Sequence, residues 1–191
     1  YRDARGVLVA LPPPALEGVV QLGNAATALA AVRELSTRLP LSRAAIEQGL
    51  GAAHLPGRFQ RRVDAAGVEW VFDVAHNPAA AAVLAANLAR YPASGRTLAV
   101  CGMLGDKEVE AVIATLAERV DQWIAATTDG PRGLDDRALA ERAAAAGISH
   151  PVKPNACWPA GRSTPDSVRI RRFPPTRACG RCCRRRAAAR G

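Results

Sequence analysis

The sequence lacks the patterns that mark a secreted or membrane-spanning protein. We find no secretory signal, and no uninterrupted apolar run reaches the length of about 18 residues that a membrane helix needs. Cys101 is the one cysteine of the sequence before residue 150, and it lies among apolar residues. A lone cysteine of this kind is typical of a small buried side chain in a reducing compartment. We therefore expect a cytoplasmic protein.

Two nucleotide-binding motifs are also missing. No G-x-x-x-x-G-K-[ST] occurs, so the sequence offers no backbone cradle of that type for the phosphates of ATP. Gly105-Asp106-Lys107 is no substitute, because it lacks both the first glycine and the hydroxyl residue that should follow the lysine. No G-x-G-x-x-G follows an expected strand, which disfavours a nicotinamide-binding Rossmann domain.

The net charge of +9 is concentrated near the end of the sequence. Residues 151–191 hold eleven basic residues and one acidic residue, whereas the rest of the sequence holds 15 basic and 16 acidic residues. The larger part is thus nearly neutral, and its charge gives no reason to expect a polyanion as partner. The Arg-rich end could still bind nucleic acid non-specifically, so a small nucleic-acid-binding protein is the alternative function.

The order of the expected elements favours an α/β fold. With 191 residues, of which 49% are hydrophobic, the sequence is long enough for one domain with a real core. The patterns predict strands at residues 58–63, 69–74, 96–101 and 122–126, and helices at residues 78–90, 107–120 and 135–146. This alternation predicts a mostly parallel, Rossmann-like sheet with helices on its faces. Two earlier helices, at 24–39 and 42–53, are typical of the end of another domain.

Periodicity disappears from about His150. Prolines come first, then arginines and cysteines, so we expect residues 150–191 to form a disordered basic tail. One hypothesis is that this tail results from reading a GC-rich coding sequence out of frame. The C-x-x-C at Cys179–Cys182 lacks the further ligands of a zinc site, and we assign no metal-binding residue.

The most informative stretch is Val71-Phe-Asp-Val-Ala-His-Asn-Pro78. Its first half favours a buried strand, and Asn77-Pro78 is typical of a helix start. Asp73 and His76 are therefore expected at the carboxyl end of a strand, where unpaired helix amides attract anions. The alternative is that Asp73 or Asn77 only caps the helix and that His76 is an ordinary loop histidine.

Four further motifs accompany this stretch in a fixed order: Gln21-Leu-Gly-Asn24, Leu55-Pro-Gly-Arg58, Cys101-Gly-Met-Leu-Gly-Asp-Lys107 and Thr127-Thr-Asp-Gly-Pro-Arg132. From about Leu11 to about Ile148, the series resembles the dihydrofolate synthase/folylpolyglutamate synthase family of the Mur ligase superfamily. The resemblance implies an ATP-dependent C–N ligase that adds L-glutamate to dihydropteroate or folate through an acyl phosphate. It also implies that residues 1–54 end a central ATP-binding domain and that residues 55–149 form an incomplete Mur-ligase-like C-terminal domain.

The resemblance further implies site residues. Four are expected to contact ATP: Asn24, Arg58, Asp73 and His76. Two are expected to bind the amino-acid carboxylate or to lie near the phosphate: Lys107 and Arg132. Local alternatives remain open, namely a helix N-cap for Asn24, a strand-end salt bridge for Arg58 and a solvated loop position for Arg132. Lys107 would open a helix against its dipole, which disfavours a purely stabilising role. No catalytic residue is assigned.

ATP and Mg²⁺ are the cofactors that the resemblance implies. The magnesium ligands and the phosphate-binding loop are expected in a portion absent from this sequence. We therefore expect a fragment that does not turn over alone. The expected partners are small molecules, namely ATP, L-glutamate and dihydropteroate or folate. We expect a monomer without a membrane partner.

Overall fold

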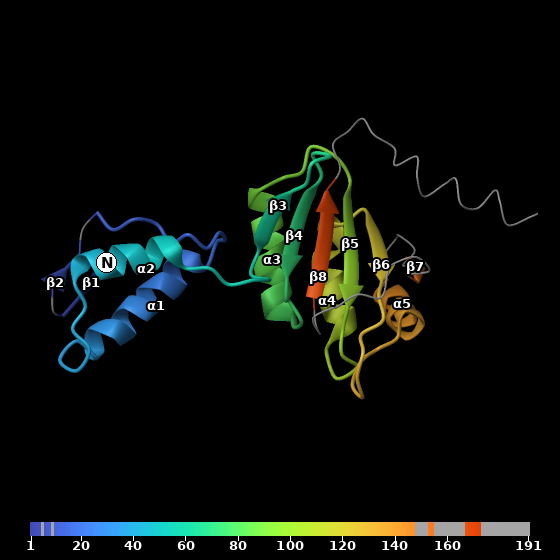
Figure 1. Ribbon diagram of the computed structural model, residues 1–191. Helices are drawn as coiled ribbons and strands as arrows, with labels where there is room; N and C mark the ends of the chain where they lie inside the picture. The colour runs from blue at the N-terminus through green and yellow to red at the C-terminus, as the bar shows by residue number, and fades with distance from the viewer. Residues whose placement is uncertain (5, 9, 148–152, 155–166, 173–191) are drawn as a thin grey trace, which may run out of the picture.

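The computed structural model describes residues 1–147 apart from residues 5 and 9, and also residues 153–154 and 167–172. These residues form a helical part near the N-terminus and an α/β part built around one sheet (Figure 1). None of the helices in these ranges combines the length and the apolar character that crossing a membrane requires.

The helical part contains four elements: β1 (Arg2–Asp3), β2 (Gly6–Val7), α1 (Gln21–Glu34) and α2 (Arg43–Ala52). Ser42 caps α2 as the sequence predicts, because its hydroxyl accepts a hydrogen bond from the Ala45 N–H at 3.2 Å. Arg33 joins α1 to the β1–β2 hairpin by donating to both carboxylate oxygens of Asp3, at 2.6 and 3.0 Å. α1 and the hairpin are thus connected by polar contacts.

Six strands form the sheet of the α/β part: β3 (Gln60–Val63), β4 (Glu69–Asp73), β5 (Thr97–Gly102), β6 (Gln122–Ala125), β7 (Lys153–Pro154) and β8 (Ser167–Arg172). Their order across the sheet is β3-β4-β8-β5-β6-β7. β5, β6 and β7 pair in parallel, and β4 runs the same way because β4 and β5 both pair antiparallel with β8. The predicted α/β fold with a mostly parallel sheet is confirmed, although β3 and β8 run in the opposite direction.

Strand β8 corrects the expectation of a disordered tail over residues 150–191. Ser167–Arg172 lies between β4 and β5, and Lys153–Pro154 forms an edge of the sheet. The prediction gave weight to arginine and proline and missed the two-residue alternation of the β-branched Val168 and Ile170. Ile170 is completely buried. The rest of the predicted tail, including its C-x-x-C and its Arg-rich end, lies outside the described residues.

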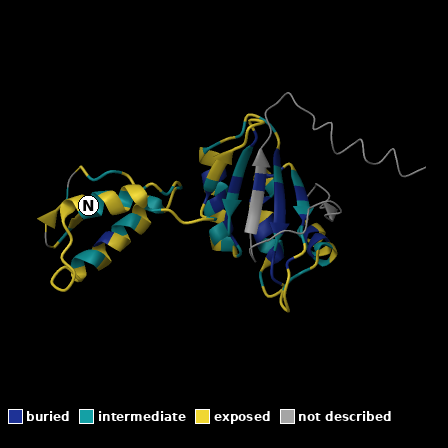
Figure 2. Cartoon of the chain, viewed as in Figure 1, coloured by how far each residue is buried: buried dark blue, intermediate teal, exposed yellow. Residues whose placement is uncertain are grey.

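Three helices cover one face of the sheet: α3 (Pro78–Arg90), α4 (Val109–Leu116) and α5 (Asp136–Ala145), with a short 3-10 turn (Ala117–Arg119) after α4. Residues that oppose one another across the central strands form a row on this face, and each is at most 1% exposed: Val71, Ile170, Ala99 and Trp123. The same core contains side chains from all three helices, and Figure 2 shows it as the buried centre of the sheet. The sequence predicts helices on both faces, but the described helices of this part lie on a single face.

Two helix starts bear on the predicted site. Asn77 caps α3, since its side chain accepts a hydrogen bond from the Ala80 N–H at 2.8 Å, and Pro78 follows in the first turn. One of the two local alternatives for this stretch, capping by Asn77, is thus realised. α4 begins at Val109, later than predicted. Lys107 therefore lies in the turn before the helix and does not open it.

A short segment before α1, which we call the strap, fastens the helical part to the α/β part: Glu17, Gly18 and Val19. The Val19 N–H donates to the side-chain oxygen of Asn87 at 2.7 Å, and Asn87 is buried in α3. A Cβ atom on Gly18 would lie 3.1 Å from that amide, and its φ of +133° favours glycine. Glu17 adds an ion pair with Arg61 of β3 at 3.2 Å.

Candidate functional site

Asp73 ends β4, and its carboxylate holds two neighbouring turns. One oxygen accepts a hydrogen bond from the Phe59 N–H at 2.8 Å, and the other accepts from the Ala75 N–H at 2.9 Å. Burial raises the pKa of the Asp73 carboxyl, while these hydrogen bonds and the charge of Arg58 act in the opposite direction. The Asp73 carboxylate therefore joins the end of β4 to the turn before β3 and to the turn before α3.

Arg58 lies in the turn between α2 and β3, with an exposed side chain. The predicted strand starts later, at Gln60, because Gly57 and Phe59 adopt positive φ angles of 72° and 46°. The Val74 N–H donates to the Gly57 carbonyl at 3.0 Å and so joins this turn to the end of β4. No described carboxylate forms an ion pair with Arg58, so the strand-end salt bridge is not realised within the described ranges.

His76 follows β4 in the turn that leads to α3. Its Nδ1 lies 3.0 Å from the Val74 carbonyl oxygen. Because a carbonyl can only accept, we infer that Nδ1 carries a proton in this contact. Nε2 is then an acceptor in the neutral ring and a donor in the charged ring. Both forms suit a nucleotide, the first through a ribose hydroxyl and the second through a phosphate oxygen.

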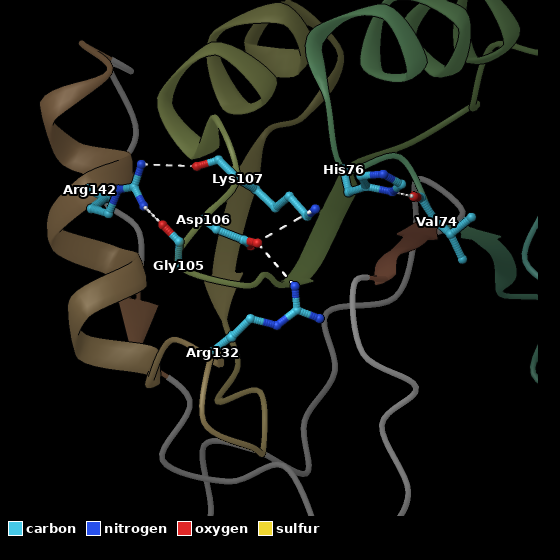
Figure 3. A network of polar contacts seen from close by, with 7 residues as sticks. All are labelled: Val74, His76, Gly105, Asp106, Lys107, Arg132 and Arg142. Atoms are coloured by element: carbon cyan, nitrogen blue, oxygen red, sulfur yellow. Dashed lines mark hydrogen bonds and ion pairs between the residues drawn. The ribbon is translucent and has the colours of Figure 1, made fainter.

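Asp106, Lys107 and Arg132 form a charged cluster beyond the carboxyl end of β5 (Figure 3). Arg132 donates to Asp106 Oδ2 at 3.1 Å, and Lys107 Nζ lies 3.9 Å from Asp106 Oδ1. Figure 3 shows the Lys107 side chain extending toward the side on which His76 lies. The structure therefore brings together the two residues predicted to bind substrate, around a carboxylate that the prediction did not include.

The strand register brings these groups to one edge of the sheet. Asp73 opposes Val168 of β8 and Gly102 opposes Ser167, so β4 and β5 end at the same level. Arg132 follows β6, which runs parallel to β5. We call this set of polar residues the rim site: Arg58, Asp73, His76, Asp106, Lys107 and Arg132. Its three Lys and Arg side chains outnumber its two carboxylates, so the rim suits an anionic ligand.

Asn24 is not part of the rim site. It lies exposed in the first turn of α1, where its amide donates to the Gln21 side chain at 3.1 Å. The helix begins at Gln21 with Val20 as N-cap, so the capping alternative for Asn24 is not realised either. α1 lies apart from the sheet in Figure 1. The structure thus separates Asn24 from the other three residues predicted to contact ATP.

Backbone hydrogen bonds join the loop that carries Arg132 to the turn that carries Lys107. The Gly105 N–H donates to the Arg132 carbonyl at 2.7 Å, and the Leu134 N–H donates to the Met103 carbonyl at 3.1 Å. A Cβ atom on Gly133 would collide with the backbone of the same loop, so glycine is needed there. Sequence reasoning missed this contact, although the cluster of Gly, Pro and Asp in the loop indicates a tight turn.

The match to a protein family decides the identity of this α/β part. Residues 57–160 match the model described as "Mur ligase, glutamate ligase domain". The chain belongs to this family. The matched range covers more than half of the chain and contains the rim site.

Several curated Mur-family relatives are dihydrofolate synthase/folylpolyglutamate synthases. The protein from Escherichia coli strain K12 is 45% identical over 141 residues, which cover 74% of this chain and 32% of the relative. The Mycobacterium tuberculosis protein is 36% identical over 65% of this chain and 26% of its own length. The predicted family resemblance is confirmed, and the chain spans about a third of the length of the curated relatives it matches.

Solved structures agree with this family. The structure of E. coli FolC in complex with ADP has a TM-score of 0.65 and 41% identity, and covers 80% of this chain and 34% of FolC. A bifunctional folylpolyglutamate synthase/dihydrofolate synthase with Mn, AMPPNP and L-glutamate bound has a TM-score of 0.61 and 43% identity, and covers 78% of this chain and 33% of that protein. Close relatives of this Mur-family chain are therefore ATP-dependent ligases.

The candidate metal ligands of this domain are its described His, Cys, Asp and Glu side chains. Within the described ranges, no group of three or more His, Cys, Asp and Glu side chains is arranged to hold a metal ion. The two rim carboxylates are occupied with other groups, Asp73 with backbone N–H groups and Asp106 with Arg132. We therefore assign no metal ligand among the residues that the structure describes.

Proposed function

We propose that this chain contributes the glutamate ligase domain of an ATP-dependent ligase that adds L-glutamate to dihydropteroate or folate. The observation that carries the proposal is the rim site, a group of basic side chains at the carboxyl edge of a Mur-type sheet. A relative with L-glutamate and AMPPNP bound supports the choice of ligands. One E. coli FolC structure contains DHPP and ADP, and another contains ADP without folate substrate, which supports a folate-type substrate.

In this proposal the rim residues have separate roles. Bound ATP supplies the phosphoryl group that activates the acceptor carboxylate as an acyl phosphate. Arg58 stabilises phosphate charge, and Asp73 and His76 hold ribose or phosphate groups. Lys107 and Arg132 bind the carboxylate of the incoming glutamate. Asp106 lies between these two cations and limits their net charge, so that a single carboxylate suffices to complete the cluster.

We further propose that turnover needs a second module. The chain contains no G-x-x-x-x-G-K-[ST], so the loop that holds the ATP phosphates must come from elsewhere. Residues 1–54 correspond in this proposal to the end of the central ATP-binding domain, and residues 55–149 to the glutamate ligase domain. Asn24 would then reach the nucleotide from the central domain, and magnesium would be held there too.

A chimaeric enzyme tests the proposed activity. The segment of the E. coli relative that aligns with this chain is replaced by the chain itself, and ATP-dependent glutamate addition is measured. We expect activity in the chimaera, and a strong loss on Lys107→Met or His76→Ala with an unchanged circular dichroism spectrum. Arg137→Met, at an exposed position of α5, is the matched control. Unaltered kinetics in both rim variants would contradict the assigned roles.

A further inference from the structure

Arg142 of α5 makes four hydrogen bonds to the segment that carries Lys107, and Figure 3 shows the two that reach Gly105 and Lys107. Its guanidinium binds both carboxylate oxygens of Glu110, through Nε at 2.6 Å and Nη2 at 2.7 Å. It also donates to the Gly105 carbonyl through Nη1 at 3.0 Å and to the Lys107 carbonyl through Nη2 at 3.1 Å. One side chain therefore contacts three points along a single short segment.

The two carbonyls lie on either side of Asp106. A planar guanidinium that holds both of them fixes the course of the backbone through Asp106 and Lys107. On its other side the segment is held by the Gly105 N–H, which donates to the Arg132 carbonyl at 2.7 Å. The turn is thus fixed from α5 and from the loop after β6, in the region where α4 has not yet begun.

Lys107 needs such support because its side chain is long and flexible. A lysine amine is a point charge at the end of a flexible four-carbon stem, so the position of its backbone sets the region that the amine can reach. The Lys107 side chain is 27% exposed, and its ion pair with Asp106 spans 3.9 Å. This contact is too long to fix the amine by itself. The geometry of the backbone therefore decides which region Nζ can reach.

We propose that Arg142 is a positioning residue that sets the location of the Lys107 amine at the rim site and, through it, the affinity for the amino-acid carboxylate. The second half of this statement rests on the proposed function, whereas the first half does not. Lysine at position 142 cannot replace arginine, because an ammonium group lacks the planar fork that spans Glu110 and two carbonyls at once. Arg142 itself touches no substrate.

The lysine content of the chain allows a direct test. Lys107 and Lys153 are the lysines of the sequence, so reductive methylation with ¹³C gives a simple NMR spectrum that Lys107→Arg and Lys153→Arg assign. The signal of Lys107 is compared in the wild-type chain, Arg142→Lys and Arg142→Met. We expect a shifted and broadened Lys107 signal in both variants, with the Lys153 signal and the circular dichroism spectrum unchanged.

Two controls accompany the test. Arg137→Met removes another arginine of α5, one that pairs with Glu141 and is 85% exposed, and it should leave the Lys107 signal unchanged. Glu110→Gln leaves the hydrogen bonds from Arg142 to the two carbonyls in place and weakens those to the side chain of residue 110. We therefore expect a smaller shift of the Lys107 signal. Glu110→Gln also tests the proposal if Arg142→Met fails to fold. A Lys107 signal identical to wild type in folded Arg142→Lys and in Glu110→Gln would overturn the proposal.

Titration with L-glutamate separates this inference from the proposed function. If both hold, L-glutamate moves the Lys107 signal, and Arg142→Lys weakens the binding about tenfold, as small displacements of binding groups commonly do. L-glutamate could move no signal in the wild-type chain while Arg142→Lys still shifts the Lys107 signal. The positioning role of Arg142 then stands, and the proposal that Lys107 binds the glutamate carboxylate fails. Equal glutamate affinity in Arg142→Lys and wild type would overturn the effect on binding.

Discussion

At the scale of single residues, Asp73 has a structural role beside its proposed role in binding. Its two oxygens accept hydrogen bonds from the backbone N–H groups of Phe59 and Ala75. Asp73→Asn keeps the size of the side chain but turns an NH₂ group toward one of these donors. We expect a loss of about 1–3 kcal/mol in the free energy of unfolding. Urea denaturation measures it, with the exposed Asp129→Asn as control. Equal losses in both variants would contradict the structural role.

The ionisation of Glu110 should make the free energy of unfolding depend on pH. Hydrogen bonds from Arg142 lower the pKa of the Glu110 carboxyl from its ordinary 4.5 to about 2 in the folded protein. Its stabilising contribution is therefore complete above pH 4.5 and is lost as the pH falls toward 2. Because the pair is close to solvent, the contribution is at most about 1 kcal/mol and falls with salt.

Unfolding of wild type and Glu110→Gln between pH 2 and pH 7 measures this contribution. We expect the difference between the two proteins to shrink on acidification and to vanish near pH 2. Glu118→Gln, at an exposed position of the turn after α4, serves as control and should show no such trend. A difference that stays constant over the whole range would show that the contribution does not arise from the charge of Glu110.

The sequence predicts part of the rim site and misses the rest for a physical reason. Asp73, His76 and Lys107 follow strand patterns, and parallel strands bring their carboxyl ends to one edge. The contacts of Arg142 join residues more than 30 positions apart through backbone carbonyls, which no local pattern marks. The resemblance groups Asn24 with the same ligand, but no spacing rule could show that it lies on another part of the molecule.

At the scale of elements, β8 gives the clearest prediction. Ile170 is completely buried between β4 and β5 and belongs to the core under the helices. Ile170→Ala should lower the free energy of unfolding by about 2–5 kcal/mol, through lost burial and an unfilled cavity. Val63→Ala, at a β3 position that is 71% exposed, should change it by less than about 0.5 kcal/mol. Similar values for both variants in urea would argue against β8 as a central strand.

Elements with a complete local pattern are predicted best. α3 spans residues 78–90 as expected, because Asn77, Pro78 and an alanine-rich run all favour the same helix. Half of the six residues of β8 are arginines, and the strand is stabilised mainly by its two neighbours, so local propensity says little about it. The sequence predicts a start of α4 at Lys107, two residues before Val109, because Asp106 and Lys107 resemble the first turn of a helix.

At the scale of the whole molecule, the strap should control how the helical part sits against the sheet. Asn87→Ala removes the acceptor of the Val19 N–H. We expect a larger radius of gyration in small-angle X-ray scattering and faster proteolysis in the connection from Ala53 to Arg58. Asn24→Ala removes an exposed amide of α1 and is the matched control. Scattering curves and cleavage rates equal to wild type would argue against the strap.

The position of β8 has a consequence for how the chain acquires its structure. β4 and β5 are made early during synthesis, but neither can pair with the other, because the strand between them comes from residues 167–172. Until that strand arrives, the nascent protein holds two half-sheets with unpaired edges, which are prone to association. The middle of the sheet is thus completed after its two halves, so the rim site can form only once residues 167–172 have been synthesised.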